Sequence, residues 1–384
     1  MTEIADVFEH YGGAFRNQYN PSLQALKAMS AIERCRTSAL GGHVDGCDEC
    51  GHLKISYNSC RNRHCPKCQN LPKEKWLEDR KEDLLPVPYF HVVFTLPSEL
   101  NNVALRNKKI MYTLLFKASA ETLQALAADP KHLGAQIGFT SILHTWGQNL
   151  MEHPHVHCIV TGGGLSPNQS QWIPSKSKFL FPVRVMSALF RGKYLALLKE
   201  QQERRPLKSM EDEQTFKALM SQLHKKDWIV YCKPPFHSPE HVLKYFGRYS
   251  HRVAISNHRI CHMENGKVTF TWRDYKDGNK QKRMTLTAVE FIRRFLLHIL
   301  PSRFVKIRHY GLISNANRKT KLARCKEILD VPVKKKEDSC EKETWSEFLL
   351  RLTGIDPMLC PSCGKGRMNM QQTLYPQREI AIAS

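Results

Sequence analysis

Two histidines in the stretch of residues 148–164 have a spacing that suits a metal site. Apolar and β-branched residues fill the second half of this stretch and end at three glycines, which predicts a strand over residues 155–161. Side chains alternate between the faces of a strand, so His155 and His157 share one face, with Cβ atoms about 6–7 Å apart. Two imidazoles at that separation can bind one divalent ion. Two ordinary polar positions on a half-exposed strand would give the same pattern. Other features of the sequence must therefore decide whether these histidines bind a metal.

Two tyrosines, Tyr245 and Tyr249, lie four residues apart in a segment that is predicted to be helical. Residues at positions i and i+4 share a helix face, so both phenols point the same way. Such a pair usually packs into a core. Here Arg248, His251 and Arg252 flank it with groups that hydrogen-bond to phosphate, which favours a role at a phosphate-containing substrate.

Cysteines two residues apart occur twice near the N-terminus, as Cys47 with Cys50 and as Cys65 with Cys68. Each pair can form a knuckle whose thiolates bind zinc, and two knuckles complete a tetrahedral shell, so a structural zinc site is predicted. Because so small a segment buries little apolar area, the ion should supply much of its folding free energy. Four neighbouring residues could replace one of these ligands or build a second site: Cys35, Cys60, His43 and His64.

A further pair, Cys360 and Cys363, lies near the C-terminus and supplies half of a second zinc site. Cys325 and Cys340 are the only other late cysteines that could complete it. A run of three lysines at residues 334–336 resembles a linker.

The chain of 384 residues is strongly basic, because 58 Lys and Arg against 36 Asp and Glu give a net charge of +22. The excess is spread along the sequence, which is typical of a surface that binds a polyanion, so nucleic acid is the expected partner. A basic protein without such a partner is the alternative. Arg61, Arg63 and Lys67 adjoin the second knuckle and are, with Arg248 and Arg252, the candidate DNA contacts.

The sequence has no run of eighteen apolar residues and its N-terminus is acidic, so neither a membrane span nor a signal peptide is expected. A cytoplasmic, nucleoid-associated protein is the prediction. In that reducing compartment the 13 cysteines are expected to be metal ligands or buried thiols rather than disulfides.

Hydrophobic periodicity and turn residues predict the elements that must position these groups. A helical lead-in is expected over residues 1–30, and a helix that carries the tyrosines should start at Pro239 with Ser238 as its cap. A charged helical segment at residues 184–226 has the pattern of an insertion. Further helices are expected at residues 72–85, 98–127 and 287–300, and strands at residues 89–97, 135–144, 227–233, 267–273 and 304–308.

A metal held by two histidines, a tyrosine pair beside arginines and a cationic surface could together break a phosphodiester by covalent catalysis. A phenol with a pKa of about 10 is a weak nucleophile, but a nearby cation favours the phenolate. A bound metal acts as a Lewis acid on the scissile phosphate. The product would be a 5′-phosphotyrosine with a free 3′-hydroxyl, and because this link conserves the phosphodiester, a second strand could be joined without hydrolysis.

Three segments, residues 58–68, 153–158 and 245–252, carry a resemblance that extends over residues 10–315. In the order of its cysteine-rich head, its His155-Val156-His157 strand and its Tyr245-x3-Tyr249 helix, the chain resembles the HUH-type rolling-circle insertion-sequence transposases of the IS91 kind. The resemblance implies an α+β fold with a central antiparallel sheet, the palm, flanked by helices and preceded by a zinc-binding module. It also implies Mg²⁺ or Mn²⁺ and single-stranded DNA at the element ends as substrate.

The chain is expected to divide into an N-terminal helix plus zinc module over residues 1–75, a nuclease domain over residues 80–315 and a basic tail with the possible second zinc knuckle over residues 316–384. The resemblance also suggests a third metal ligand. Replication initiators with this fold carry a third ligand seven residues before the first histidine of the pair, which is Gln148 here, and Glu152 is the competing choice.

Tyr249 is favoured as the primary nucleophile, because it lies next to Arg248 and Arg252, and Tyr245 is the second. Two other functions fit the sequence. The chain could be a non-catalytic DNA-binding protein that relies on its zinc modules and charge. It could instead be a zinc hydrolase in which His153 joins the two other histidines of its strand around a catalytic ion.

Overall fold

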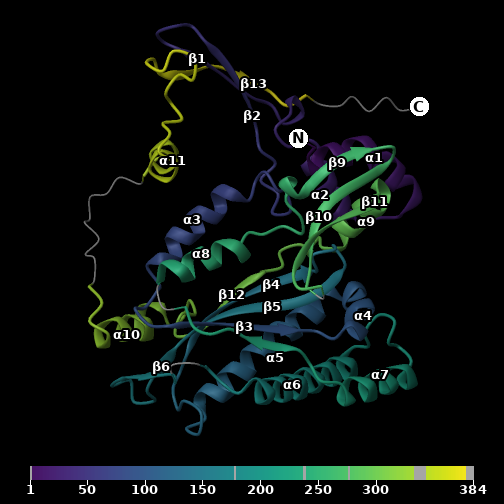
Figure 1. The fold of residues 1–384 in the computed structure, drawn as a ribbon, viewed down its shortest axis with the longest axis vertical. Helices are drawn as coiled ribbons and strands as arrows, with labels where there is room; N and C mark the ends of the chain where they lie inside the picture. Colours follow the sequence, from purple (N-terminus) through teal and green to yellow (C-terminus); the bar gives the residue numbers. More distant parts are fainter. Residues whose placement is uncertain (1, 177–178, 237–238, 276, 333–342, 378–384) are drawn as a thin grey trace.

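The computed structural model describes residues 2–176, 179–236, 239–275, 277–332 and 343–377. Its fold is mixed α+β with antiparallel sheets, which confirms the predicted class (Figure 1). The expected Ser238 cap and the lysine run at residues 334–336 fall outside the described residues. Within the described ranges, no helix combines the length and the hydrophobicity that a membrane crossing requires.

A five-stranded antiparallel sheet lies at the centre of the molecule (Figure 1). The strands expected near residues 89, 135, 155, 227 and 304 all pair here, with β5 in the middle. Because side chains alternate along each strand, the sheet presents two different faces to the helices around it. In spatial order the strands are β12 (Ile307–Gly311), β4 (Gly138–Trp146), β5 (Glu152–Thr161), β3 (Tyr89–Thr95) and β8 (Val230–Cys232).

Helices cover both faces of this central sheet. On one face, α5 (Lys108–Ala128) and α6 (Val183–Arg204) pack on the apolar side chains of alternate strand residues such as Phe94 and Val156. On the other face, α3 (Asn70–Lys81) and α8 (Pro239–Tyr249) lie side by side over Ile142 and Ile159. The tyrosine helix therefore lies on the face toward which His155 and His157 point.

Two expected helices are interrupted. The helix predicted over residues 98–127 breaks at Asn107, whose side chain hydrogen-bonds to both the backbone N–H and the carbonyl of Lys208. The segment predicted at residues 184–226 forms two helices, α6 and α7, which are separated near Pro206. The resulting pieces are η2 (Ser98–Leu100), α4 (Asn101–Arg106), α5, α6 and α7 (Glu213–Lys225).

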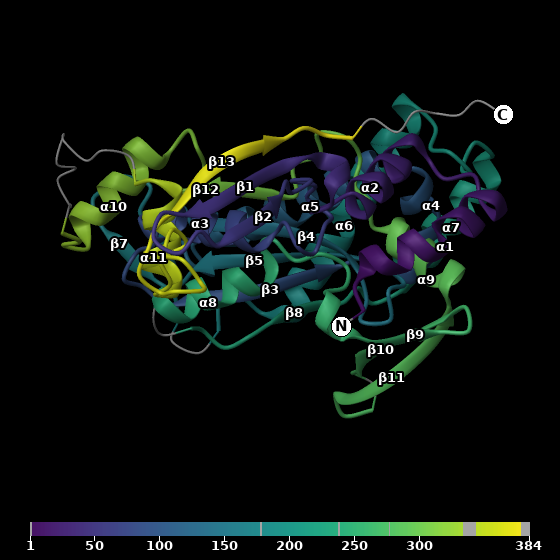
Figure 2. The ribbon, with the colours of Figure 1, turned by 90° about the horizontal axis from the view of Figure 1, so that it is seen from above.

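A second layer joins the N-terminal helices to a three-stranded sheet. Phe8 packs edge-to-face on Phe295, with ring centroids 5.3 Å apart, in a core separate from that of the central sheet. This sheet projects from the body in Figure 2. The layer contains α1 (Ile4–Gln18), α2 (Leu23–Glu33), α9 (Ala288–Leu297), β9 (Ile260–Glu264), β10 (Lys267–Asp274) and β11 (Lys280–Thr287).

Segments from the two ends of the chain form a third sheet. Strand β1 (Gly42–Cys47) lies between β2 (Leu53–Tyr57) and β13 (Met368–Leu374), and all pairs are antiparallel (Figure 2). Helix α11 (Trp345–Thr353) precedes this late strand. The C-terminal segment thus folds back onto the N-terminal cysteine-rich region.

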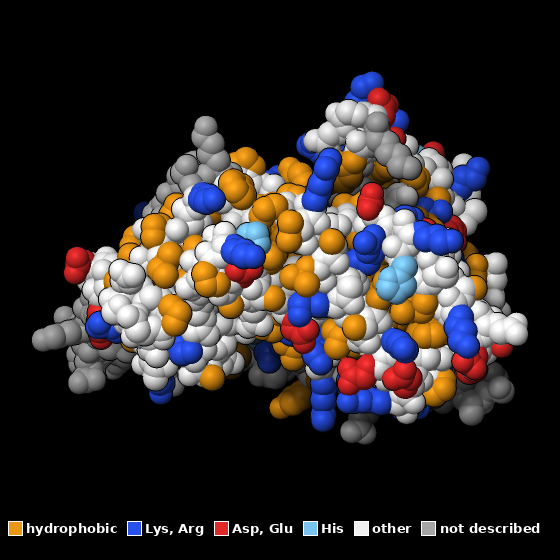
Figure 3. Space-filling model, turned by 90° about the horizontal axis from the view of Figure 1, so that it is seen from below, with side chains coloured by type: hydrophobic (Ala, Val, Ile, Leu, Met, Phe, Trp, Pro, Cys, Tyr) orange, Lys and Arg blue, Asp and Glu red, His pale blue; other side chains and the backbone are white. Residues whose placement is uncertain are grey.

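Smaller elements complete the described chain. Figure 3 views the molecule from the side of α6 and α7, where acidic and basic side chains are interspersed. On α6, for example, Arg204 pairs with Glu200 at 2.6 Å. The remaining elements are η1 (Ser38–Leu40), β6 (Gly163–Leu165), β7 (Trp172–Pro174), η3 (Asn257–Arg259), the π-helical turn η4 (Arg318–Leu322) and α10 (Ala323–Ile328).

Candidate active site

Three histidines meet on one face of the central sheet. His155 and His157 point the same way from β5, as the alternation predicts, and His144 of the adjacent strand β4 lies directly opposite His155. The candidate ligand atoms of the three imidazoles lie within 4.8 Å of one another. Nε2 of His157 is buried and has no hydrogen-bond partner among the described residues. A buried nitrogen without a partner, beside two further imidazoles, is suited to a metal ion.

His144 takes the place that the resemblance assigns to Gln148. The side-chain amide of Gln148 instead donates a hydrogen bond to the hydroxyl of Tyr275 at 3.2 Å, in an exposed turn. Because β4 and β5 are antiparallel neighbours, register rather than sequence distance brings His144 to the pair. We therefore replace Gln148 by His144 as the candidate third ligand.

The competing ligand Glu152 lies elsewhere. Its position in β5 has the opposite parity to the histidines, so its side chain points to the other face. There it accepts a hydrogen bond of 2.7 Å from the hydroxyl of Tyr112. Burial raises the pKa of Glu152 to about 7, and Lys108 opposes this rise.

The two tyrosines of α8 converge on the histidines. The hydroxyls of Tyr245 and Tyr249 are 3.1 Å apart, and the ring of Tyr249 lies 4.2 Å from that of His157, measured between centroids. Tyr245 is only 7% exposed, whereas Tyr249 is half-buried and more open to solvent. The three-histidine site and both phenols therefore share one location.

A fourth histidine, His91, links the phenols to the site formed by His144, His155 and His157. Its Nδ1 is 2.7 Å from the hydroxyl of Tyr245, and its Nε2 is 2.8 Å from Nδ1 of His157. Sequence reasoning missed this residue, although it lies in a correctly predicted strand. His91 lies diagonally across β3 and β5 from His157, and only the strand register reveals that proximity.

Burial lowers the pKa values of the imidazoles of the site, which favours their neutral form. Desolvation lowers the pKa of His91 and of His155 to about 3. Burial also holds the pKa values of His144 and His157 well below the usual range, and the charges of neighbouring histidines and of Arg252 add to this effect. A neutral imidazole offers the lone pair that a metal ion needs.

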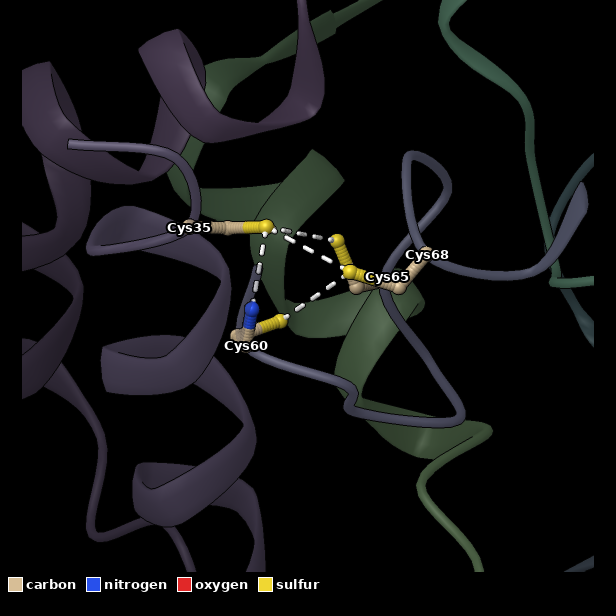
Figure 4. A group of neighbouring side chains, drawn as sticks. All are labelled: Cys35, Cys60, Cys65 and Cys68. Atoms are coloured by element: carbon tan, nitrogen blue, oxygen red, sulfur yellow. Dashed lines mark hydrogen bonds between the residues drawn. The ribbon is translucent and has the colours of Figure 1, made fainter. Parts of the chain in front are cut away.

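The cysteines form two groups of four, and neither group is the predicted shell of Cys47, Cys50, Cys65 and Cys68. In the first group all sulfur atoms lie within 4.8 Å of one another, and those of Cys35 and Cys68 are 3.4 Å apart (Figure 4). Cys35 follows α2, while the other members lie in the loop after β2. The group consists of Cys35, Cys60, Cys65 and Cys68.

The second group joins Cys47 and Cys50 to Cys360 and Cys363. The expectation that the first two share an ion with Cys65 and Cys68 is therefore corrected. Cys47 and Cys50 lie at the turn of the β1–β2 hairpin, whereas Cys65 and Cys68 follow the far end of β2, a strand that spans about 15 Å by its rise per residue.

The cysteines expected to complete a zinc site with Cys360 and Cys363 are not the ones that lie beside them, because Cys47 and Cys50 take that place. Cys325 is fully buried in the apolar core beside the central sheet, and Cys340 lies outside the described residues. Backbone N–H groups, chiefly that of Gly366, lower the pKa of Cys363 to about 6, which favours the thiolate that zinc binds.

The candidate DNA contacts differ in their availability. Arg61 and Arg252 are exposed. Arg63 donates to the carbonyls of Pro301 and Phe304 at 2.9 and 2.6 Å, so it fastens the zinc loop to the central domain. Lys67 is ion-paired with Glu3, and the side chain of Arg248 is outside the described part of the structure.

Comparison with known proteins gives two family matches. A model described as "Transposase zinc-binding domain" matches residues 7–96, and one described as "Putative transposase" matches residues 138–321. The second segment contains the three histidines that cluster and both tyrosines. The protein is therefore a transposase with an N-terminal zinc-binding domain.

Two relatives refine this assignment. "Putative transposase y4qJ" of Sinorhizobium fredii (strain NBRC 101917 / NGR234) is 49% identical over 373 residues, which cover 95% of this chain and 94% of the relative. "Transposase for insertion sequence element IS801" of Pseudomonas savastanoi pv. phaseolicola is 27% identical over 351 residues, 88% of this chain and 82% of that protein. The chain belongs to the IS91 family of transposases. No solved structure matches it.

Proposed function

We propose that this transposase nicks and rejoins single-stranded DNA at the element ends through a 5′-phosphotyrosine, as one step of rolling-circle transposition. The observation that carries the proposal is the position of the Tyr249 ring, 4.2 Å from His157 and beside the three-histidine site. A nucleophile and a metal-type site at one location are what covalent phosphodiester cleavage requires. By analogy with the HUH nucleases, the central sheet with α8 is the palm of a nuclease domain over residues 80–315.

His144, His155 and His157 are the residues that would hold the catalytic ion. When bound there, a divalent cation supplies Lewis-acid assistance at the scissile phosphate. Three nitrogen ligands favour Mn²⁺ over Mg²⁺, which prefers oxygen. In the zinc-binding domain, each group of four thiolates suits one structural Zn²⁺. Residues 343–377 complete the second group and so belong functionally to the zinc module.

The hydrogen bonds around His91 support different roles for the two tyrosines. If Nε2 of His157 held the ion, the proton of this imidazole would reside on Nδ1 and would be donated to Nε2 of His91. His91 then donates from Nδ1 to the oxygen of Tyr245, and Tyr245 donates its own proton to the oxygen of Tyr249. Tyr249 therefore receives a hydrogen bond, which stabilises its phenolate.

Tyr249 is accordingly the nucleophile, and Tyr245 is a positioning residue. The phenolate oxygen of Tyr249 bonds to phosphorus, the bond from phosphorus to the 3′ oxygen breaks, and the leaving oxygen takes a proton to become a 3′-hydroxyl. In the reverse direction, a 3′-hydroxyl of another strand attacks the phosphotyrosine and releases the phenol. Arg252 is exposed near the histidines and is placed to hold the DNA phosphate.

Mass spectrometry of the covalent adduct tests this function. A single-stranded oligonucleotide from an element end, incubated with Mn²⁺, should become linked to the peptide that contains Tyr249. His155→Ala should abolish the adduct, and Tyr375→Phe, at an 83% exposed tyrosine outside the central sheet, should leave it unchanged. Failure of the wild-type protein to form an adduct would favour a DNA-binding protein without this catalytic activity.

The ligand set can be tested without measuring activity. His144→Ala should weaken Mn²⁺ binding at least tenfold in calorimetric titration, whereas Gln148→Ala should not change it. Three imidazoles also suit a zinc hydrolase, in which water is the nucleophile. A hydrolase would retain cleavage in Tyr249→Phe and would form no covalent adduct. His153, which lies outside the cluster of three, is not needed in either mechanism.

A further inference from the structure

A large cavity lies apart from the three histidines, between the zinc module and helix α11. It has a volume of about 940 Å³. One wall is the loop around the first cysteine group, a second is the start of α3, and a third is the segment of residues 256–258. Trp345 and Leu349 of α11 close the remaining side. We call this cavity the α11 groove.

The α11 groove is lined by cationic side chains. Arg36 and Arg61 are both exposed, and within the described ranges neither guanidinium takes part in a hydrogen bond or ion pair. Lys67 also lines the groove, but Glu3 neutralises it and is the only acidic residue of the lining. The two guanidinium groups therefore have no acidic partner among the lining residues, unlike the face of α6, where opposite charges are paired. A polyanion is the complementary ligand.

An aromatic ring accompanies these charges. The indole of Trp345 is 58% exposed, although most residues of that size and type are buried. In the part of the chain that the structure describes, it has no ring contact and no hydrogen-bond partner. An open aromatic face beside arginines is the combination that binds single-stranded nucleic acid, because unpaired bases stack on the ring while phosphates contact the cations. Paired bases in a duplex would not offer their faces.

The groove is connected to the active site through two shared elements. Helix α3, whose first residues line the groove, packs on the tyrosine helix through Trp76 and Phe246, with ring centroids 5.4 Å apart. The segment of residues 256–258 follows the tyrosine helix along the chain. Figure 1 shows α3 and α8 together below α11. A strand held in the groove could therefore continue toward the phenols.

We propose that the α11 groove binds a single-stranded DNA segment that flanks the cleavage point, with a base stacked on Trp345 and phosphates on Arg36 and Arg61. This inference rests on the proposed nuclease function for its substrate, but it predicts binding rather than cleavage. It also gives the return of the C-terminal segment a purpose, since α11 completes a binding surface that the N-terminal module cannot form alone.

Binding of two labelled oligonucleotides to the full-length protein tests the proposal. One spans only the nick site, and the other extends it by about ten nucleotides on each side. Trp345→Ala should weaken binding of the long oligonucleotide about tenfold and that of the short one less than twofold. Trp345→Phe, which keeps a stacking face, should recover most of the affinity. Tyr375→Ala, at an 83% exposed aromatic outside the groove, is the matched control and should have no effect.

Salt dependence separates charge from stacking. Arg36→Gln and Arg61→Gln should each reduce the slope of log affinity against log salt by roughly 0.7 for the long oligonucleotide. Arg205→Gln, at an exposed arginine beyond α6, should leave that slope unchanged. Unaltered affinity of Trp345→Ala for the long oligonucleotide would overturn the proposal, as would equal losses for both lengths. Adduct formation on the short oligonucleotide reports separately on the nuclease function.

Discussion

Replacing Tyr245 by phenylalanine tests the assignment of roles within the tyrosine pair. The substitution removes the hydroxyl that lies 2.7 Å from His91 and 3.1 Å from the hydroxyl of Tyr249. It keeps the ring that packs on Phe236, with centroids 4.7 Å apart. The effect on the reaction should therefore come from the lost hydrogen bond rather than from a cavity.

The magnitude follows from the charge of the acceptor. A hydrogen bond to an ionised group contributes about 1.5–3 kcal/mol, which corresponds to a roughly 10- to 150-fold slower reaction if the bond forms only to the Tyr249 phenolate. The same change leaves Nδ1 of His91 without this partner in a buried site, so the free energy of unfolding should fall by about 1–3 kcal/mol.

Single-turnover adduct formation, with the protein in excess over the oligonucleotide, measures the rate at a series of pH values. Tyr249→Phe is the reference for complete loss, and Tyr375→Phe is the reference for an unaltered site. A Tyr245→Phe protein that reacts at the wild-type rate would refute the hydrogen-bond chain. If Tyr249→Phe still formed an adduct while Tyr245→Phe did not, the two roles would be reversed.

Three further predictions concern stability and metal content. Burial raises the pKa of Glu152 to about 7, so the free energy of unfolding should decline as the pH rises from about 4.5 through 7. In urea titrations, Glu152→Gln should remove this decline. At pH 4 the variant should be as stable as the wild type. Cys363→Ser should lower bound zinc from two equivalents to one and expose residues 343–377 to limited proteolysis. Gly311→Ala should lower the free energy of unfolding by more than about 2 kcal/mol, because φ is 61° there and the added Cβ would lie 1.9 Å from a backbone oxygen. Gly278→Ala is the control, because its φ of 57° is similar but the added Cβ would meet open space. It should lower the free energy of unfolding by only about 1 kcal/mol.

Features that depend on short stretches of chain were predictable from the sequence. The shared face of His155 and His157 follows from the two-residue period of a strand, and the shared face of Tyr245 and Tyr249 follows from the helical period. Each Cys-x-x-Cys pair is likewise a local unit. The strands of the central sheet could be located because their apolar runs end at glycine and proline, although the sequence did not give their order.

Features that depend on register and on chain return were decided only by the tertiary structure. His144 and His91 reach the site because β4 and β3 pair with β5 in one particular register, which no local pattern specifies. The hairpin of β1 and β2 separates two knuckles that are close in sequence, and the last strand brings Cys360 and Cys363 to one of them. Periodicity fixes the direction of a side chain, whereas its partners across a sheet depend on how distant segments pack.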